Sequence, residues 1–208
     1  MKLALAAAVV FAMAGTAFAA PKYTTKYTYY SINGQSAGDL YDAMLRRGPH
    51  VNGAKAYAST AATSRQEGKL LQGKSCKVVD YRFVIDFTIR LPKLTSERAL
   101  TGVTKARWQA FSGFLRKHEE THRSIWLECA RDLEAQVRSI RATDCKTADR
   151  QVDKLWDSIR ASCNRRHDAF DTAEQRRLAK HPFVKLVIAN AQSATKAVAS
   201  PRKKRKKA

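Results

Sequence analysis

The motif His118-Glu119-Glu120-Thr121-His122 has the spacing His-Glu-x-x-His. Residues four apart on a helix lie one turn apart on the same face, so both imidazole rings can reach a single metal ion. A zinc ion held there lowers the pKa of a bound water, and Glu119 is placed to accept the proton of that water as a general base. The alternative is a structural role, in which both histidines are satisfied by hydrogen bonds on a mostly apolar helix face.

The residues around the motif predict a long helix. From about Thr104, apolar positions recur at steps of three or four over about nine or ten turns. The resulting stripe consists of Trp108, Phe111, Leu115, His118, His122, Ile125, Cys129, Leu133, Val137 and Ile140. Both motif histidines therefore belong to the face that the helix should bury.

A second helix is predicted over 147–178, after a break at Asp144 that is a candidate helix cap. Its inner face carries Val152, Leu155, Trp156, Ile159 and Cys163. Because the connection is short, the two helices should form an antiparallel hairpin.

The hairpin geometry indicates where a third zinc ligand should lie. If the chain turns back near 144–146, positions whose numbers add up to roughly 290 face each other, because both helices rise about 1.5 Å per residue. The window opposite the motif contains His167, Asp168, Asp171 and Glu174. For any one of these side chains, the alternative is an ordinary solvated helix end.

The four cysteines, Cys76, Cys129, Cys145 and Cys163, favour two disulfides in an oxidising compartment. Four cysteines allow three connectivities, between which the spacing alone does not choose. The hairpin geometry, however, brings Cys129 opposite Cys163 and leaves Cys76 to pair with Cys145. A cysteine-liganded zinc site is the alternative, but the chain contains no Cys-x-x-Cys pair.

The remaining elements predict a small sheet. Alternating residues indicate strands over 23–33 and, most clearly, 76–92, which Pro92 should close. A helix from the Ser36 cap to Arg47, a weaker strand over 56–64, a loop over 67–75 and a short apolar helix at 183–191 complete the chain. We therefore expect an α+β fold, in which a small antiparallel sheet packs on the long antiparallel helical hairpin.

Residues 1–19 have the pattern of a secretory signal peptide, with cleavage after Ala19. Cleavage would leave 189 of the 208 residues, which we divide into a single domain over 20–195 and a basic disordered tail over 196–208. No later stretch approaches the roughly 18 to 20 apolar residues that span a bilayer. These features predict an exported protein, in the periplasm or outside the cell.

The chain is strongly basic, with 39 lysines and arginines against 18 aspartates and glutamates. Without Lys2 of the leader the net charge falls from +21 to +20, and six of these charges lie in 202–207. Such a charge favours acidic partners, which include anionic lipid headgroups, cell-wall polymers and nucleic acid. A solvated tail without a partner is the alternative.

Four segments carry a resemblance to a known family: YTYYSINGQSAGDLYDAMLRRGP, YRFVIDFTIRLPK, RWQAFSGFLRKHEETHRSIW and NRRHDAFDTAE. Through them the chain resembles the bacterial predicted secreted zinc-dependent proteases, also classed as domain of unknown function 922, over nearly the whole mature chain. The resemblance implies a zincin-like metallopeptidase in which His118 and His122 bind zinc and Glu119 is the general base.

The last of these segments departs from the family pattern. Family members carry an aromatic residue and Asp, then Thr, then His-Gly; Phe170-Asp171 matches the pair here. Glu174 stands where Thr is expected, and Arg176 stands where His is expected. Asp171 satisfies both the hairpin geometry and the family pattern, so we predict it as the third ligand.

The alternatives for the third ligand are His167, Glu174 and His181. The predicted function is hydrolysis of a peptide or protein substrate by a zinc-activated water. The competing prediction is a non-catalytic basic protein that binds envelope polymers or nucleic acid and whose motif is structural or vestigial.

Overall fold

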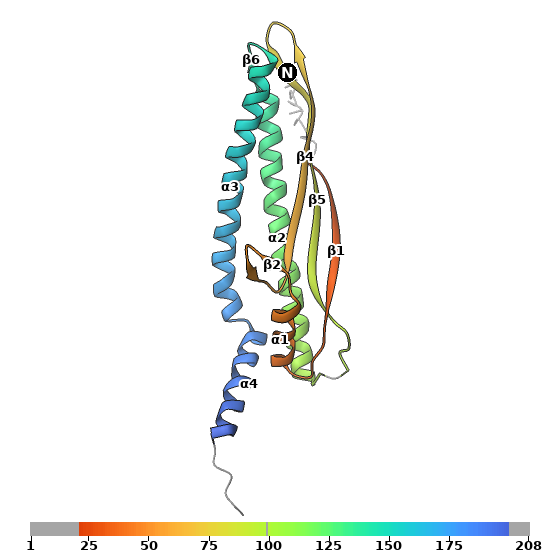
Figure 1. Ribbon diagram of the computed structural model, residues 1–208, viewed down its shortest axis with the longest axis vertical. Helices are drawn as coiled ribbons and strands as arrows, with labels where there is room; N and C mark the ends of the chain where they lie inside the picture. The colour runs from red at the N-terminus through yellow and green to blue at the C-terminus, as the bar shows by residue number, and fades with distance from the viewer. Residues whose placement is uncertain (1–20, 99, 200–208) are drawn as a thin grey trace, which may run out of the picture.

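A sheet lies along one side of a pair of long helices in the computed structural model, which describes residues 21–98 and 100–199 (Figure 1). The elements in chain order are β1 Lys22–Ile32, α1 Ala37–Arg47, β2 His50–Val51, β3 Ala54–Lys55, β4 Ser59–Gln72, β5 Cys76–Leu94, α2 Gly102–Ser139, β6 Arg141–Ala142, α3 Cys145–Ala179 and α4 Pro182–Ala199. The expected α+β class is confirmed. The predicted leader and residues 200–208 of the predicted tail lie outside the described part of the chain.

The sheet is mixed rather than antiparallel, which corrects the prediction. Its strand order is β1-β5-β4, and β6 pairs with the start of β5. β4 and β5 form an antiparallel hairpin, whereas β1 runs parallel to β5, with Lys22 opposite Val84. The cause is α1 with the β2–β3 hairpin: they return the chain so that β4 starts near the end of β1, and β5 then reverses the direction again.

β4 is longer than predicted and includes most of the expected 67–75 loop. Gly68 sits at a register shift between Glu67 and Lys69, where a Cβ atom would lie 3.3 Å from the Cα atom of Tyr81. Gly73 lies in the hairpin turn itself. The two glycines that suggested a single loop therefore have different roles. Gly68 allows a close contact between two strands, and Gly73 forms the turn.

β5 shows the predicted alternation, because Phe83, Ile85, Phe87 and Ile89 are all buried. Pro92 does not end this strand, which continues to Leu94 beside β1. β4 pairs with β5 no further than Arg90, so the missing N–H of Pro92 costs no hydrogen bond on that side.

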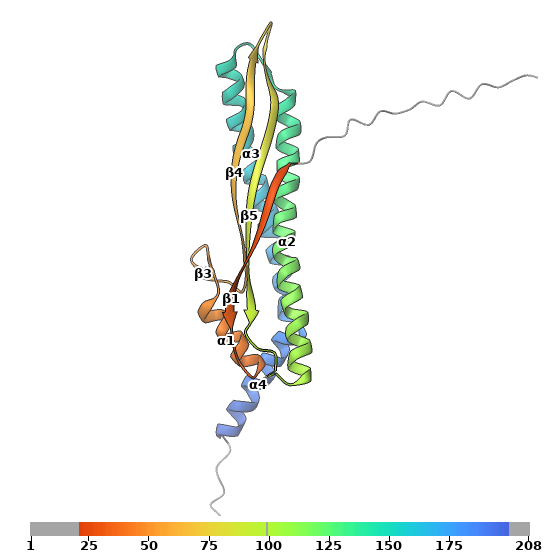
Figure 2. The ribbon, with the colours of Figure 1, turned by 90° about the vertical axis from the view of Figure 1, so that its right-hand side faces the viewer.

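The two predicted long helices are confirmed as α2 and α3, which lie side by side in Figures 1 and 2. Ser36 caps α1 in a capping box with Asp39, and the Asp144 side chain accepts a hydrogen bond from the Thr147 N–H at the start of α3. The last helix exceeds the prediction, since α4 continues to Ala199, four residues into the predicted tail. None of the helices in the described part of the chain is long and apolar enough to cross a bilayer.

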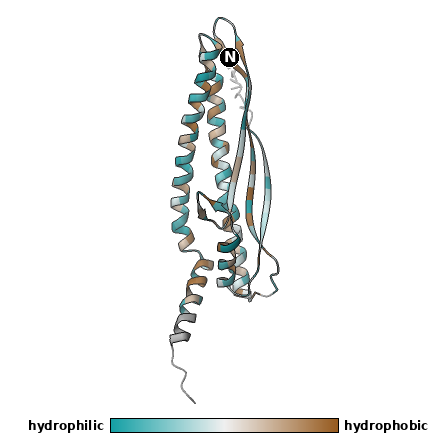
Figure 3. Cartoon of the chain, viewed as in Figure 1, coloured by the Kyte–Doolittle hydropathy of each residue, from teal (hydrophilic) through white to brown (hydrophobic). Residues whose placement is uncertain are grey.

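Two apolar clusters fill the space between sheet and helices. One joins α1, the end of β1 and the first half of α2 around Phe111 and Phe183. The other joins β5 to the second half of α2 around Phe83 and Leu133. In Figure 3, α3 is mostly hydrophilic with scattered apolar turns. The motif from His118 to His122 lies between the two clusters on α2.

Candidate metal centre

His118 and His122 lie one turn apart on α2, between the two apolar clusters. Their Nε2 atoms are 3.1 Å apart, and both side chains are largely buried. Burial, followed by the neighbouring His122, lowers the pKa of His118 below its ordinary value, so its ring is neutral at pH 7 and can offer a lone pair.

Asp171 reaches both histidines from α3. Its Oδ1 atom is 2.9 Å from Nε2 of His122 and 3.3 Å from Nε2 of His118. With the 3.1 Å separation of the two nitrogen atoms, these distances form a nearly equilateral triangle. Tetrahedral zinc with ligands at about 2.0–2.1 Å has ligand atoms about 3.3 Å apart, which fits this donor set. Among the described residues, these three form the one cluster of at least three His, Cys, Asp or Glu suited to a metal ion.

The other nitrogen of each ring has its own partner. Nδ1 of His122 is 2.8 Å from Nδ1 of His167, and Nδ1 of His118 is 3.9 Å from Oε2 of Glu174. Burial, followed by the charge of His122, lowers the pKa of His167 to about 4, so this ring is neutral and its Nδ1 can accept a hydrogen bond from Nδ1–H of His122. Such partners fix the tautomer and orientation of metal-binding imidazoles.

Two further contacts hold this arrangement in place. Arg177 donates to Oε1 of Glu174 at 2.7 Å, which supplies a charge partner for that buried carboxylate. The ring of Phe170 lies 4.9 Å from the ring of His118 and 5.1 Å from that of His122, between centroids. The aromatic residue of the Phe170-Asp171 pair therefore packs on both imidazoles while Asp171 faces their Nε2 atoms.

Glu119 is only 5% exposed, and among the described residues its side chain has one hydrogen-bond partner, the hydroxyl of Thr60 on β4. Thr60 Oγ1 lies 2.8 Å from Oε2 of Glu119 and 3.0 Å from its main-chain oxygen. Burial raises the pKa of Glu119 to about 7, opposed by the Thr60 hydrogen bond and aided by the charge of Asp171. A carboxylate with such a pKa is suited to exchange protons near neutral pH.

The sequence analysis missed Thr60. This residue lies in the weakest predicted strand, and no motif marks it. Its contact with Glu119 forms because β4 passes beside α2, and the two residues are 59 positions apart in the chain. The sequence alone does not show that this strand and this helix lie side by side, so no local pattern could have identified Thr60.

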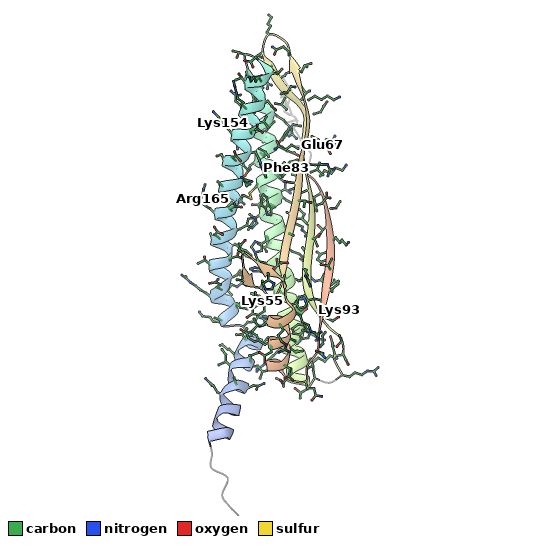
Figure 4. The ribbon with its side chains drawn as sticks, viewed as in Figure 1. Lys55, Glu67, Phe83, Lys93, Lys154 and Arg165 are labelled. Atoms are coloured by element: carbon green, nitrogen blue, oxygen red, sulfur yellow. A yellow bond between two sulfur atoms is a disulfide. The ribbon has the colours of Figure 1, made fainter. Side chains whose placement is uncertain are left out.

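The centre opens into a cleft of about 660 Å³. The β2–β3 hairpin and the start of β4 form one wall, α3 forms the other, and α2 forms the floor. Residues of the cleft include Lys55, Tyr57, Thr60, Phe114, His118, Glu119, His122, Trp126, Asn164, His167, Asp168, Asp171 and Glu174. Figure 4 places Lys55 at the level of this cleft, beside the two long helices.

The predicted site residues divide into three groups. His118, His122 and Asp171 converge, and Glu119 lies beside them. His167 and Glu174 stand behind the histidine rings rather than in the triangle. His181 lies at the start of α4, where its Nδ1 atom accepts from the Phe183 N–H at 3.2 Å and its ring packs 5.2 Å from that of Phe111.

Both predicted disulfides are present, Cys129–Cys163 and Cys76–Cys145. The first connects α2 to α3 one helical turn before His167, and the second fastens the start of β5 to the start of α3. The Cys129–Cys163 bond therefore fixes the two helices against each other next to the residues that converge.

Comparison with known proteins gives a family but no activity. The model of a family described as bacterial protein of unknown function (DUF922) matches residues 27–179. The matched range includes the motif, Thr60 and the α3 residues that face them. No curated protein matches, and no solved structure matches.

Proposed function

The chain belongs to the DUF922 family of bacterial proteins, and we propose that it is an exported zinc-dependent metallopeptidase. The observation that carries the proposal is the convergence of His118, His122 and Asp171. Beside them lies the buried carboxylate of Glu119, whose hydrogen-bond donor is the neutral hydroxyl of Thr60. Two histidines and one carboxylate are a ligand set of catalytic zinc sites, which keep a fourth position open.

The chemistry divides between the ion and the chain. Zinc bound by these three side chains would lower the pKa of a bound water and polarise a carbonyl group. Glu119 accepts the proton of the attacking water on its carboxylate and returns it to the leaving amine nitrogen. Thr60 holds the carboxylate through Oε2. His167 and Glu174 keep the imidazole rings turned with Nε2 towards the metal position.

The substrate is an extended peptide segment of a protein or a cell-wall peptide. β4 is an edge strand of the described sheet, and its first residues form a wall of the cleft. A peptide that adds to this edge by main-chain hydrogen bonds would lie across Glu119 with one of its peptide bonds close to the three ligands.

The proposed location is outside the cytoplasm. Two disulfides are compatible with an oxidising compartment, and residues 1–19 have the pattern of an export signal. A second candidate function, a non-catalytic binder of anionic polymers, is favoured by the excess of basic residues.

The test combines metal content with hydrolysis of a quenched-fluorescent peptide library by the mature, zinc-reconstituted protein. We expect about one zinc per chain, and a hydrolysis rate that Glu119→Gln lowers by about 10²- to 10⁴-fold while zinc stays bound. Glu120→Gln is the matched control, because the carboxylate of Glu120 accepts from Tyr27 on the opposite flank of α2.

Either of two results would reject the proposal: no zinc after reconstitution, or hydrolysis that persists unchanged in Glu119→Gln. The first would leave the polymer-binding candidate. The second would indicate a contaminating protease.

A further inference from the structure

A cluster of tyrosines and cations lies where β1 and β5 meet the side of α2 that is turned away from the candidate metal centre. We call this cluster the tyrosine–arginine flank. It consists of Tyr23, Tyr27 and Tyr29 of β1, Lys93 of β5, and Arg116 and Arg123 of α2. β1 is an edge strand of the described sheet, and Tyr23 and Tyr29 are 47% and 49% exposed. The proposed peptidase chemistry does not use any of these residues.

Tyr27 is the centre of the cluster and contacts both arginines. The guanidinium carbon of Arg116 lies 5.2 Å from the Tyr27 ring centroid, and Nη1 of Arg123 lies 3.5 Å from the Tyr27 hydroxyl oxygen. The hydroxyl itself donates to Glu120 at 2.6 Å. The Tyr27 hydroxyl is therefore held by Glu120 of α2, and Tyr27 in turn contacts two guanidinium groups that lie about two turns apart on that helix.

Two more contacts extend the cluster along β1. Arg116 also donates to the Tyr29 hydroxyl at 3.4 Å, and Nζ of Lys93 lies 5.8 Å from the centroid of the Tyr29 ring. Arg123 donates to the hydroxyl of Thr25 at 3.3 Å. Three cations are thus ordered by neutral hydroxyl groups and aromatic rings rather than by acids.

The cations of the flank have no ion-pair partner in the part of the chain that the structure describes. Within residues 21–98 and 100–199, Lys93, Arg116 and Arg123 form no ion pair with a carboxylate, although arginines elsewhere do, such as Arg138 with Glu134 and Arg177 with Glu174. Glu120 is the one acid in direct contact with the cluster, and its contact is with the Tyr27 hydroxyl. Lys93 and Arg116 are exposed and Arg123 is half-buried, so this ordered group of three cations beside one acid carries a net positive charge that an anionic partner could neutralise.

We propose that the tyrosine–arginine flank binds an anionic polysaccharide, with Arg116, Arg123 and Lys93 contacting carboxylate or phosphate groups repeated along the glycan. Arg116 and Arg123 are seven residues apart on one helix, so their Cα atoms are separated by about 10 Å along its axis. A linear chain that carries a charge on each repeat can reach both arginines.

A polysaccharide fits this surface better than a single-stranded nucleic acid. Proteins that bind single strands stack bases on open aromatic faces. Here the rings of Tyr27 and Tyr29 already carry cations, and the ring of Tyr23 meets Phe87 edge-on, with centroids 6.3 Å apart. Hydroxyl groups and guanidinium donors at a strand edge instead match the hydroxyl and acidic groups of a sugar chain.

The test measures binding of polygalacturonate, a glycan with one carboxylate per sugar, to the full mature chain by titration calorimetry at several NaCl concentrations. A background with Arg202, Lys203, Lys204, Arg205, Lys206 and Lys207 changed to Gln removes the contribution of the tail. In this background we compare Arg116→Gln/Lys93→Gln with Lys154→Gln/Arg165→Gln. Both doubles remove two charges, and Lys154 and Arg165 are exposed on α3 in Figure 4, away from Lys93.

We expect Arg116→Gln/Lys93→Gln to weaken binding about tenfold or more and to reduce its dependence on salt. Lys154→Gln/Arg165→Gln should weaken binding about twofold at most, since distant exposed charges are screened. Tyr27→Phe keeps the ring but frees Arg123 and Glu120, and we expect a smaller loss.

Three results would overturn the proposal. The two double variants could weaken binding equally, which would indicate that the glycan is attracted by the net charge of the protein and not by this flank. A dT 20-mer could bind more tightly than polygalacturonate, which would identify a nucleic-acid surface. The protein with the neutral tail could fail to bind at all. None of these results depends on whether the chain hydrolyses peptides, so this proposal and the proposed function can fail separately.

Discussion

Two buried glutamates on α2 stand in opposite environments. Glu134, in the half of the helical hairpin far from the metal centre, is 2% exposed and accepts from the Phe83 N–H at 2.7 Å and from Arg138 at 3.1 Å. Glu119, at the candidate metal centre, is also buried, but within the described residues its side chain has only the Thr60 hydroxyl as a hydrogen-bond partner. The first carboxylate is held by a cation and a main-chain donor, and the second faces an open cleft.

The comparison distinguishes two halves of the hairpin. We call the half around Glu134 the structural half, and the half around Glu119, which we propose is catalytic, the functional half. Around Glu134, the apolar side chains of Phe83 and Leu133 pack between α2 and β5, and Arg138 lies beside the carboxylate. Around Glu119, α2 and α3 present imidazole and carboxylate groups to a cleft. A buried acid without a charge partner is costly to a fold. The presence of Glu119 at this end of the hairpin is therefore one reason why we propose a catalytic role for it.

We expect the largest effect on this comparison from the removal of a proposed metal ligand. We expect His118→Ala, His122→Ala and Asp171→Ala each to lower bound zinc from about one per chain to near none, because a three-ligand site tolerates no loss. Elemental analysis of proteins purified identically measures the effect. His181→Ala is the control and should keep the zinc, because its side chain contacts Phe183 and Phe111. Zinc retained in Asp171→Ala would show that another residue completes the site.

We expect the second-largest effect from removing the disulfides, and the two disulfides should differ in their effect on zinc binding. We expect Cys129→Ser/Cys163→Ser and Cys76→Ser/Cys145→Ser each to lower the free energy of unfolding by about 2–5 kcal/mol. Only the first pair should also weaken zinc binding, because it fixes α3 beside His167. Chemical denaturation of the metal-free proteins and competitive zinc titration measure the two effects. Equal weakening of zinc binding by both pairs would show that the whole hairpin, not its functional half, holds the ligands.

The two glutamates should respond differently to the same substitution. Glu134→Leu removes the acceptor of the buried Phe83 N–H and should lower the free energy of unfolding by about 1–3 kcal/mol. Glu119→Leu should cost less or stabilise the metal-free protein, since Thr60 can donate instead to the main-chain oxygen of residue 119. Urea denaturation of both variants without metal tests the contrast. A larger loss in Glu119→Leu would contradict the division into structural and functional halves.

The smallest expected effect concerns Thr60. Thr60→Val removes the hydroxyl that holds Glu119 and should lower kcat on a cleaved library peptide about five- to tenfold, since one hydrogen bond contributes about 1 kcal/mol. KM and zinc content should not change. Thr60→Ser keeps the donor and should restore most of the rate. If serine fails to do so, the loss comes from packing of β4 and not from the hydrogen bond.

Local periodicity predicted a large part of the fold and of the site. The 3.6-residue pattern fixed both long helices, and the short connection fixed which positions face each other. His122 therefore lies against His167, His118 against Asp171, and Cys129 against Cys163, as the hairpin geometry predicted. These relations are regular consequences of helix rise and of one turn, so a single sequence contains them.

The tertiary structure alone decided the rest. The parallel pairing of β1 with β5 and the approach of Thr60 to Glu119 both join residues far apart in sequence. No local period reports which strand edges meet, because pairing is selected by how the whole chain buries its apolar faces. The sequence thus determined which residues could bind a metal, and the packing of the sheet on the hairpin determined how the glutamate between them is buried and held.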